Sequence, residues 1–514
     1  MASTRDRVGL DADPAHRRTC RRARAGWCAR PACECLHRGG TPRAGRLGSG
    51  DPRGQRPCAP PTRRTDSRSR VDDRLGCGES DRSRTCGLHG SVLRRRSRLH
   101  RNREQRRSVR PRLRSRRRGR CRGAGIAVRR GALAGHGRSP HLMESAGPDL
   151  SLTDVLPSAA AAVGVPGAED RLGIGDSDVV VVCLVDGLGA HDLEEYPELF
   201  DALSDARGGS IAAAFPTTTA TGLASLGTGL PSGQHGIVGA SFWLPEFGRT
   251  LHPLHWGSHP PSVAVQPEPT VFEQIEAAGA SAVAIGPAAY AGSGLTRAVL
   301  RGARYIHAES IDERIGSLER EVAAATNNER LVAYVYWPSL DRAGHEHGAG
   351  SEAWRAAASQ VNTLIRGLQG VLPGTGRMVV TADHGMVDAG QRIWWEDEPA
   401  LHWGVRSLAG EPRMRHVYVV DDPEAVAMRW REALGERAVV HTRAAAVASG
   451  LFGAVDPALV DRIGDVVVVL EPGTCVASRQ VDGRVSALPG QHGGTSDRER
   501  RIPGLILDGG AWNR

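Results

Sequence analysis

Three short apolar runs, each followed by residues able to bind a metal ion, constrain the fold of this chain most strongly. The runs are Val179–Val185, Leu331–Trp337 and Met378–Val380. Continuous apolar runs rich in Val are typical of parallel strands that are buried on both faces. Apolar residues at helical spacing occupy intervening segments, such as 361–371, so strands and helices alternate. The pattern predicts an α/β fold with a mostly parallel central sheet.

Polar residues follow each run, where the strand should end. Asp186 follows the first, Asp341 and His345 follow the second, and Asp383 and His384 follow the third. Open α/β folds bind ligands at the carboxyl ends of their strands. Neighbouring Asp and His side chains offer an oxygen and a nitrogen to a divalent metal ion. Each residue alone is explained more simply as a turn or helix-capping residue, so the inference depends on their convergence at one edge.

A threonine-rich segment follows another predicted strand, Ile211–Phe215. It has the sequence Pro216-Thr217-Thr218-Thr219-Ala220-Thr221-Gly222 and leads into a predicted helix at Leu223–Leu226. This order places a hydroxyl group at a helix N-terminus, where unpaired N–H groups and the helix dipole favour negative charge. A Thr hydroxyl becomes a useful nucleophile when a metal ion activates it. Simple N-capping of the helix is the alternative.

Together these segments resemble the type I phosphodiesterase/nucleotide pyrophosphatase family of the alkaline phosphatase superfamily. The resembling motifs are Pro216-Thr217-x-Thr219, Thr228-Gly229-Leu230-Pro231, His235-Gly236-Ile237, Asp341-Arg342-Ala343-Gly344-His345, Asp383-His384-Gly385 and His492-Gly493-Gly494. The resemblance implies a three-layer alkaline-phosphatase-like fold, with helices on both faces of the sheet and a small α+β insertion. We expect residues 143–514 to form this domain and residues 389–489 to form the insertion or cap region within it.

The resemblance also implies a site with two divalent metal ions, Zn²⁺ or alternatively Mn²⁺. The expected ligands are Asp341, His345 and His492 for one ion, and Asp186, Asp383, His384 and Thr219 for the other. The attacking hydroxyl is expected on Thr219, with a phospho-Thr intermediate. Thr217 and Thr218 are close enough in the sequence to remain rivals for this role.

Two features leave the substrate open. The family usually carries a Pro-Asn pair after the nucleophile, whose Asn helps to hold the transferring phosphoryl oxygen, but this chain has Thr221 and Gly222 there. A later Pro- and Gly-rich stretch contains Phe242, Trp243, His255 and Trp256. These aromatic residues either stack on a nucleobase or another planar leaving group, or pack within a surface loop.

His347 lies outside the family pattern, and we expect it at the surface.

The expected function is hydrolysis of phosphodiester or nucleotide pyrophosphate bonds in a small phosphoester or nucleotide substrate. A phosphomonoesterase or phosphonate hydrolase using the same site is the alternative. A sulfatase is disfavoured, because the chain lacks the Cys/Ser-x-Pro-x-Arg segment that those enzymes modify. The sequence does not indicate an oligomeric state.

Residues 1–142 differ from the rest in composition. They contain about 39 Arg and about 11 acidic residues, whereas the remainder contains about 28 Arg and about 46 acidic residues. They also contain eight of the ten cysteines, Cys20, Cys28, Cys33, Cys35, Cys58, Cys77, Cys86 and Cys121. Because no sustained apolar periodicity occurs there, we expect a disordered or mis-started leader, with Met143 as the natural start. A basic arm for nucleic acid is a less favoured alternative, and a zinc module is weaker still.

The location expected from the sequence is cytoplasmic. No apolar segment resembles a signal peptide, and no run is long enough to span a membrane. Outside the leader only Cys183 and Cys475 remain, which suits a reducing compartment.

Overall fold

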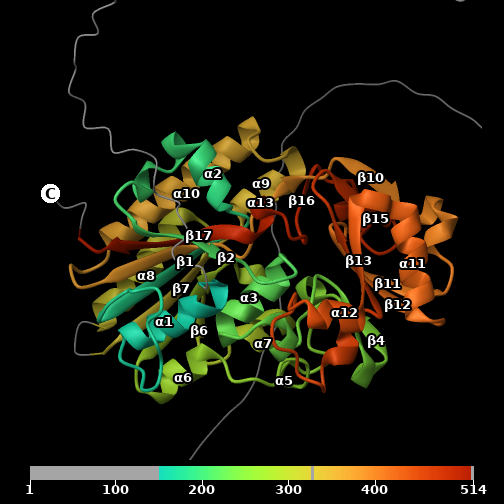
Figure 1. The fold of residues 1–514 in the computed structure, drawn as a ribbon. Coiled ribbons are helices and arrows are strands. Elements are labelled where there is room, and N and C mark those ends of the chain that lie inside the picture. The colour runs from blue at the N-terminus through green and yellow to red at the C-terminus, as the bar shows by residue number, and fades with distance from the viewer. Residues whose placement is uncertain (1–149, 326–328, 511–514) are drawn as a thin grey trace, which may run out of the picture. The chain divides into compact units, whose positions relative to one another are not determined.

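A seven-stranded sheet forms the centre of residues 150–325 and 329–510, which the computed structural model describes (Figure 1). Its strand order is β2-β17-β8-β1-β7-β5-β6. The strands are β1 Val179–Val185, β2 Arg207–Ala212, β5 Ser281–Gly286, β6 Arg304–His307, β7 Leu331–Trp337, β8 Arg377–Thr381 and β17 Arg501–Asp508. Only β17 runs antiparallel to its neighbours. The predicted α/β fold with a mostly parallel central sheet is therefore confirmed.

The register of the central strands explains why their ends meet. Every residue of β1 is buried, as expected for a strand covered on both faces. Val185 of β1 pairs with Trp337 of β7, and Leu184 pairs with Thr381 of β8. The three strands therefore end at the same level, and the polar residues that follow them emerge at one edge of the sheet.

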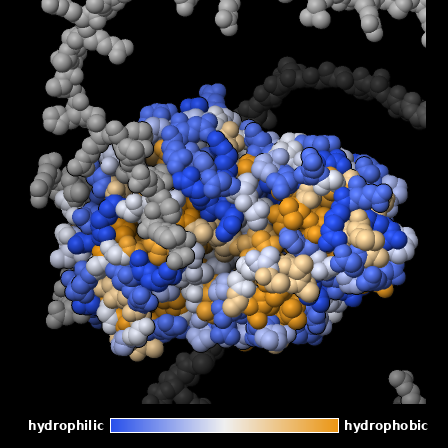
Figure 2. Space-filling model, in the orientation of Figure 1, coloured by the Kyte–Doolittle hydropathy of each residue, from blue (hydrophilic) through white to orange (hydrophobic). Residues whose placement is uncertain are grey.

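Helices cover both faces of this sheet, which gives the three layers (Figure 1). One face carries α1 Val155–Ala162, α3 Thr219–Thr228, α6 Val271–Ala277 and α7 Gly294–Val299. The other face carries α2 Ala190–Glu195, α8 Ile311–Ala325, α9 Ser339–His347 and α10 Glu352–Gly370. The short helices are α4 Ser232–His235, α5 Ser262–Val265 and α13 Asp497–Arg500. Figure 2 shows that hydrophilic residues cover most of one face of the surface, with apolar residues in separate patches.

A second, smaller sheet lies within residues 405–470. It is antiparallel, in the order β11-β12-β14-β13. Its elements are β11 Val405–Glu411, β12 Met414–Val419, α11 Pro423–Leu434, β13 Ala438–Thr442, α12 Arg443–Ala448 and β14 Val466–Leu470. The remaining strands are paired as β3 Phe242–Leu244 with β4 Arg249–Leu251, β10 Gln391–Trp394 with β15 Thr474–Ala477, and β9 Val387–Asp388 with β16 Gly490–Gln491. The small sheet has its own apolar core around Trp430. The bounds 389–489 of an insertion stay a prediction.

Two predicted elements differ from the structure. The strand expected at Ile211–Phe215 instead ends at Ala212. The sequence of residues Asp456–Ile463 also predicts a helix, and this prediction is wrong, because only a 3-10 turn forms there, at Val460–Arg462. The Arg462 guanidinium is buried there and donates to the carbonyl oxygens of Gly236 at 3.1 Å and Val265 at 2.6 Å. These tertiary contacts compete with a regular helix.

The predicted leader, residues 1–142, and the proposed start at Met143 lie outside the described residues, as does the nucleic-acid alternative that depends on them. Among the helices of the described residues, none has the length and apolar character needed to cross a membrane.

Candidate metal centre and active site

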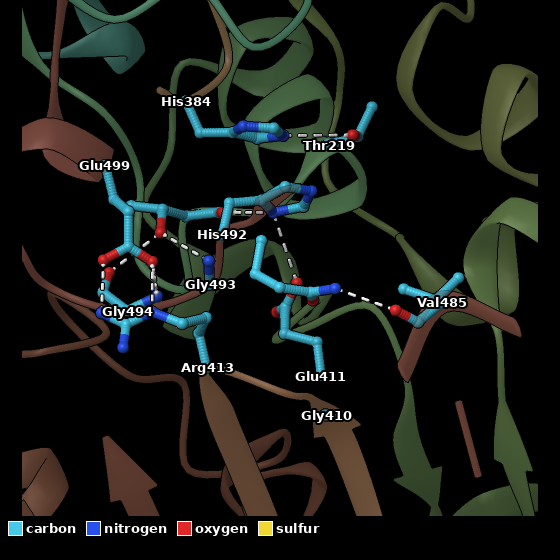
Figure 3. A network of polar contacts seen from close by, with 12 residues as sticks. Thr219, His384, Gly410, Glu411, Arg413, Val485, His492, Gly493, Gly494 and Glu499 are labelled. Carbon is cyan, nitrogen blue, oxygen red and sulfur yellow. Dashed lines mark hydrogen bonds and ion pairs between the residues drawn. The ribbon is translucent and has the colours of Figure 1, made fainter. Parts of the chain in front are cut away.

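The site residues predicted from the sequence meet beyond the carboxyl ends of the central strands. Asp186 follows β1, Asp341 and His345 lie on α9 after β7, Asp383 and His384 follow β8, Thr219 is the first residue of α3, and His492 lies between β16 and α13. Segments more than 300 residues apart in the sequence thus contribute to one cluster, part of which is drawn in Figure 3.

One group of candidate ligands consists of Asp341, His345 and His492. Each offers an atom that lies within 4.8 Å of the others. The Nε2 atoms of His345 and His492 are 3.1 Å apart, and His345 Nε2 is 3.5 Å from Asp341 Oδ2. His492 Nε2 is 4.0 Å from Asp341 Oδ1. The i, i+4 spacing of Asp341 and His345 places both side chains on one face of α9.

A second group consists of Asp186, Asp341 and His384, again within 4.8 Å. His384 Nε2 lies 3.7 Å from Asp186 Oδ1, 3.6 Å from Asp383 Oδ2 and 3.3 Å from Thr219 Oγ1. Asp341 therefore belongs to both groups, which makes them adjacent. The rings of His384 and His492 are stacked with their centroids 3.7 Å apart (Figure 3).

All three histidines present the same ring nitrogen to the centre of the cluster. Each Nδ1 atom faces a backbone carbonyl oxygen instead: His345 that of Gly490 at 2.8 Å, His384 that of Gly385 at 3.0 Å, and His492 that of Thr217 at 2.9 Å. A carbonyl oxygen only accepts, so Nδ1 carries the proton and Nε2 keeps its lone pair. This is the usual way in which a protein orients histidines that bind metal.

The carboxylates of the cluster are short of hydrogen-bond donors. Asp186 Oδ1, Asp341 Oδ1 and Asp383 Oδ2 are buried without a hydrogen-bond partner. Burial, together with the charges of Asp383 and Asp341, raises the pKa of Asp186 well above its usual value. Burial also raises the pKa of Asp383. Unpartnered buried oxygens beside imidazole lone pairs are the donor set that a divalent ion requires, so these residues fit a metal centre.

Burial lowers the pKa of His492 well below its usual value, and the neighbouring His384 and His345 lower it further. The ring is therefore held in the neutral form, which is the form that binds a metal ion.

Two glycines allow this close packing. At Gly187, with φ of 75°, an added Cβ would lie 2.9 Å from Asp341 Cβ. At Gly222 an added Cβ would lie 2.7 Å from Asp383 Cβ. The Gly187 N–H also donates to Asp383 Oδ1 at 3.2 Å. The glycine at position 222, where the family usually has Asn, thus lets α3 pack directly on the candidate ligand Asp383.

The three rival threonines have different surroundings. Thr217 donates to the Gly494 carbonyl at 2.9 Å and accepts from the Gly493 N–H at 3.0 Å. Its hydroxyl is thus held by two backbone hydrogen bonds. Thr218 is the N-cap residue of α3, but its side chain makes no capping hydrogen bond. Thr219 alone of the three faces His384 and lines the adjacent cavity. Simple N-capping therefore does not explain this segment.

A cavity of about 470 Å³ opens beside Asp186, Thr219, Asp341 and His345. Four tyrosines line it, Tyr290, Tyr305, Tyr334 and Tyr336, together with aliphatic residues and Arg342. Tyr336 donates its hydroxyl hydrogen to Asp186. The buried Tyr334 hydroxyl has no hydrogen-bond partner.

The aromatic residues expected to border this cavity mostly do not. Only His255 lines it. Phe242 and Trp256 are buried, and Trp256 Nε1 donates to the Pro260 carbonyl at 2.9 Å, while Trp243 packs under Arg406. These three side chains thus pack against other parts of the protein and do not border the cavity. His347 is more than half exposed, as expected for a surface residue.

A buried ion pair attaches the segment that carries His492 to the second sheet (Figure 3). Arg413, in the turn between β11 and β12, donates through Nε to Glu499 Oε1 at 3.1 Å and through Nη2 to Glu499 Oε2 at 2.8 Å. Both side chains are fully buried. Glu499 also accepts from the Gly494 N–H at 2.8 Å. No local pattern in the sequence marks this pair, because its partners are far apart along the chain.

Comparisons with known proteins bear on the family and the fold of the chain. The family model described as "Type I phosphodiesterase / nucleotide pyrophosphatase" matches residues 180–495. A structure of murine ectonucleotide pyrophosphatase/phosphodiesterase 5 is similar with a TM-score of 0.52 and 18% identity, covering 64% of this chain and 88% of that one. A murine variant with one threonine replaced by alanine, described as inactive and in complex with AMP, is similar with a TM-score of 0.52 and 17% identity. The match covers 64% of this chain and 87% of that one. Human ectonucleotide pyrophosphatase/phosphodiesterase 5 is similar with a TM-score of 0.50 and 16% identity. The match covers 63% of this chain and 87% of that one. A search of curated proteins found no match.

Proposed function

The chain belongs to the type I phosphodiesterase/nucleotide pyrophosphatase family, and we propose that this hydrolase cleaves phosphodiester or nucleotide pyrophosphate bonds with Thr219 as the nucleophile and two divalent metal ions. The observation that carries the proposal is a cluster of imidazole lone pairs and unpartnered carboxylate oxygens in which His384 Nε2 lies 3.3 Å from Thr219 Oγ1. A purely structural cluster would bury these groups with their hydrogen bonds satisfied.

The residues that would hold the ions fall into the two adjacent groups. Asp341, His345 and His492 would bind one ion, and Asp186, Asp383, His384 and Thr219 would bind the other. We propose zinc because the donors are a mixture of nitrogen and oxygen, with manganese as the alternative. Ions bound there would lower the pKa of the Thr219 hydroxyl and offset the charge of the phosphoryl oxygens.

Thr219 would form a covalent intermediate. Its Oγ1 bonds to phosphorus while the bond from phosphorus to the leaving oxygen breaks, and water then displaces Oγ1 to release the phosphoryl product. The position of Thr219 at the start of α3 adds the unpaired N–H groups of the helix terminus to the stabilisation of the phosphoryl oxygens. The inactive murine threonine-to-alanine variant in complex with AMP supports a catalytic threonine and a nucleotide ligand.

The tyrosine-lined cavity would receive the organic part of the substrate. It borders both Thr219 and Asp186, and its walls are mostly apolar. The Tyr334 hydroxyl is available to an acceptor atom of the bound group. We propose a small phosphoester or a nucleotide as the substrate. A phosphomonoesterase or phosphonate hydrolase remains the second candidate, because the site chemistry is shared.

Thr219→Ala tests the proposal in the full-length protein. Turnover of bis(p-nitrophenyl) phosphate and of a dinucleoside pyrophosphate should fall by about 1,000-fold or more, while the metal content stays at two ions per chain. Thr228→Ala is the matched control, since Thr228 lies in the same helix and its hydroxyl donates to the Ala224 carbonyl at 2.7 Å and accepts from the Leu230 N–H at 3.2 Å, with no bond to the candidate site residues. Comparing p-nitrophenyl phosphate with the diester separates the two candidate activities. Unchanged turnover in Thr219→Ala would move the nucleophile to Thr217 or Thr218.

The location that we propose remains cytoplasmic. Its support is that Cys183 and Cys475, the cysteines of the described residues, are both free.

A further inference from the structure

A carboxyl group from the second sheet reaches the candidate metal centre. Glu411 is the last residue of β11, and its side chain is directed toward His492 (Figure 3). Glu411 Oε2 lies 3.5 Å from His492 Nδ1. The residue is only 5% exposed, and its Oε1 has no hydrogen-bond partner. Gly493 packs against the same carboxyl, since an added Cβ there would lie 2.6 Å from Glu411 Cδ.

The charge pairing around Glu411 does not explain its burial. Arg413, two residues further on, is paired with Glu499 instead. Arg415 is paired with Asp482. Within the described residues, no arginine forms an ion pair with Glu411, and its basic neighbour is His492, whose ring is held in the neutral form. A buried carboxyl group with an unpartnered oxygen lowers stability, so its presence needs a reason other than stability.

We propose that Glu411 is a positioning residue for His492. The Nδ1–H group of His492 lies between the Thr217 carbonyl at 2.9 Å and Glu411 Oε2 at 3.5 Å. The hydrogen bond to the Thr217 carbonyl and the packing of the Glu411 carboxyl against the ring fix the rotation of the imidazole, and Nε2 then faces Asp341 and His345. The Thr218 hydroxyl contacts the same carboxyl. One side chain of the second sheet thus touches both the segment that leads to Thr219 and the residue that completes a metal-binding group.

The role is one of shape and hydrogen-bond acceptance. It rests on the proposed function, because His492 is a metal ligand only under that proposal. A shorter side chain at position 411 would remove the oxygen that lies beside His492 Nδ1 and would leave free space beside Gly493, so the ring could turn. A side chain of the same length that keeps an acceptor oxygen would hold the ring equally well.

Metal affinity in three variants tests this inference. The affinity of purified full-length protein for Zn²⁺ is measured by competition with a chelating dye, and the content by elemental analysis. Glu411→Ala and Glu411→Asp should lower the affinity for one of the two ions by about 10- to 100-fold. The affinity of Glu411→Gln should stay within about threefold of the wild-type value. Asp482→Ala is the matched control, because it removes another acid with a buried side chain, one that contacts Arg415 and not His492.

The results that would overturn the positioning role of Glu411 differ from the result that would refute the proposed function. Wild-type affinity in Glu411→Ala, or an equal loss in Asp482→Ala, would overturn the positioning role. A loss in Glu411→Gln as large as in Glu411→Asp would also overturn it, because charge would then matter more than shape. The Asp and Gln pair decides the question even where the Ala variant does not fold. A wild-type protein that binds no ion would refute the proposed function itself.

Discussion

Restoring the family's asparagine at position 222 should damage the site rather than improve it. Gly222 is the fourth residue of α3, and the family usually has Asn at the matching position. A Cβ added there would lie 2.7 Å from Asp383 Cβ and 3.1 Å from its Cα and carbonyl oxygen. Two of these three atoms belong to the backbone, so a rotamer change cannot relieve the contact.

Two opposing effects set the magnitude for Gly222→Ala. Replacing Gly by Ala inside a helix stabilises it by about 1 kcal/mol, whereas overpacking a buried site costs about 1–3 kcal/mol. The net effect is a destabilisation of about 0–2 kcal/mol, and more for Asn. The larger consequence is functional, because relief of the contact moves the backbone of Asp383. We therefore expect metal affinity to fall by about 10- to 100-fold in Gly222→Ala.

The assay compares Gly222→Ala and Gly222→Asn with Gly316→Ala. Gly316 lies inside α8, and its added Cβ would meet only Arg320 Nη1 at 3.6 Å, an ordinary contact. Gly316→Ala should thus gain stability, by up to about 1 kcal/mol, in urea unfolding, with unchanged Zn²⁺ affinity. If Gly222→Ala gains as much stability as Gly316→Ala and binds Zn²⁺ like wild type, the packing argument is refuted.

Two further predictions concern buried charges. Burial raises the pKa of Asp192 to about 7, against about 3.9 in the unfolded chain, so folding takes up a proton and stability falls by about 3 kcal/mol as the pH rises from 4 to 7. Asp192→Asn should remove that part of the slope in urea midpoints measured across this range; an unchanged slope would contradict the assignment. Arg413→Met should lower the free energy of unfolding by about 3–5 kcal/mol, because Glu499 is left buried and unpaired. The double variant with Glu499→Met should regain much of this loss, and strict additivity of the two losses would argue against the pairing.

The parts of the fold that depend on local pattern were predictable from the sequence. β1 and β7 have the predicted bounds, because each is an unbroken apolar run with polar residues at its end. Thr219 begins α3, as the order of strand, turn and helix indicates. Where local pattern was ambiguous, the prediction was wrong, as at Asp456–Ile463, where the buried guanidinium of Arg462 replaces helical regularity.

The surroundings of the site were not predictable in the same way. Tyr334 and Tyr336 line the cavity from alternate positions of β7, two residues apart and thus on one face of the strand. In a strand that is buried throughout, alternation in hydropathy is absent, so the sequence does not mark which face meets a cavity. Glu411 is harder still, because it reaches His492 from a different sheet, and a buried acid at a strand end has no distinguishing local pattern.

The carboxylates and histidines of the candidate metal centre are not explained by their contribution to stability. Asp186, Asp341 and Asp383 are mutually repulsive, and each has a buried oxygen without a hydrogen bond. Replacing them by apolar residues would relieve both costs, so stability alone does not account for them. Their histidine neighbours are oriented in advance by backbone carbonyls, so the lone pairs face inward without help from any ion. A cation bound among these carboxylates and imidazole nitrogens would offset the repulsion between the charges and so stabilise the folded protein. The stability of this edge of the sheet would then depend on the same ions that we propose to activate Thr219.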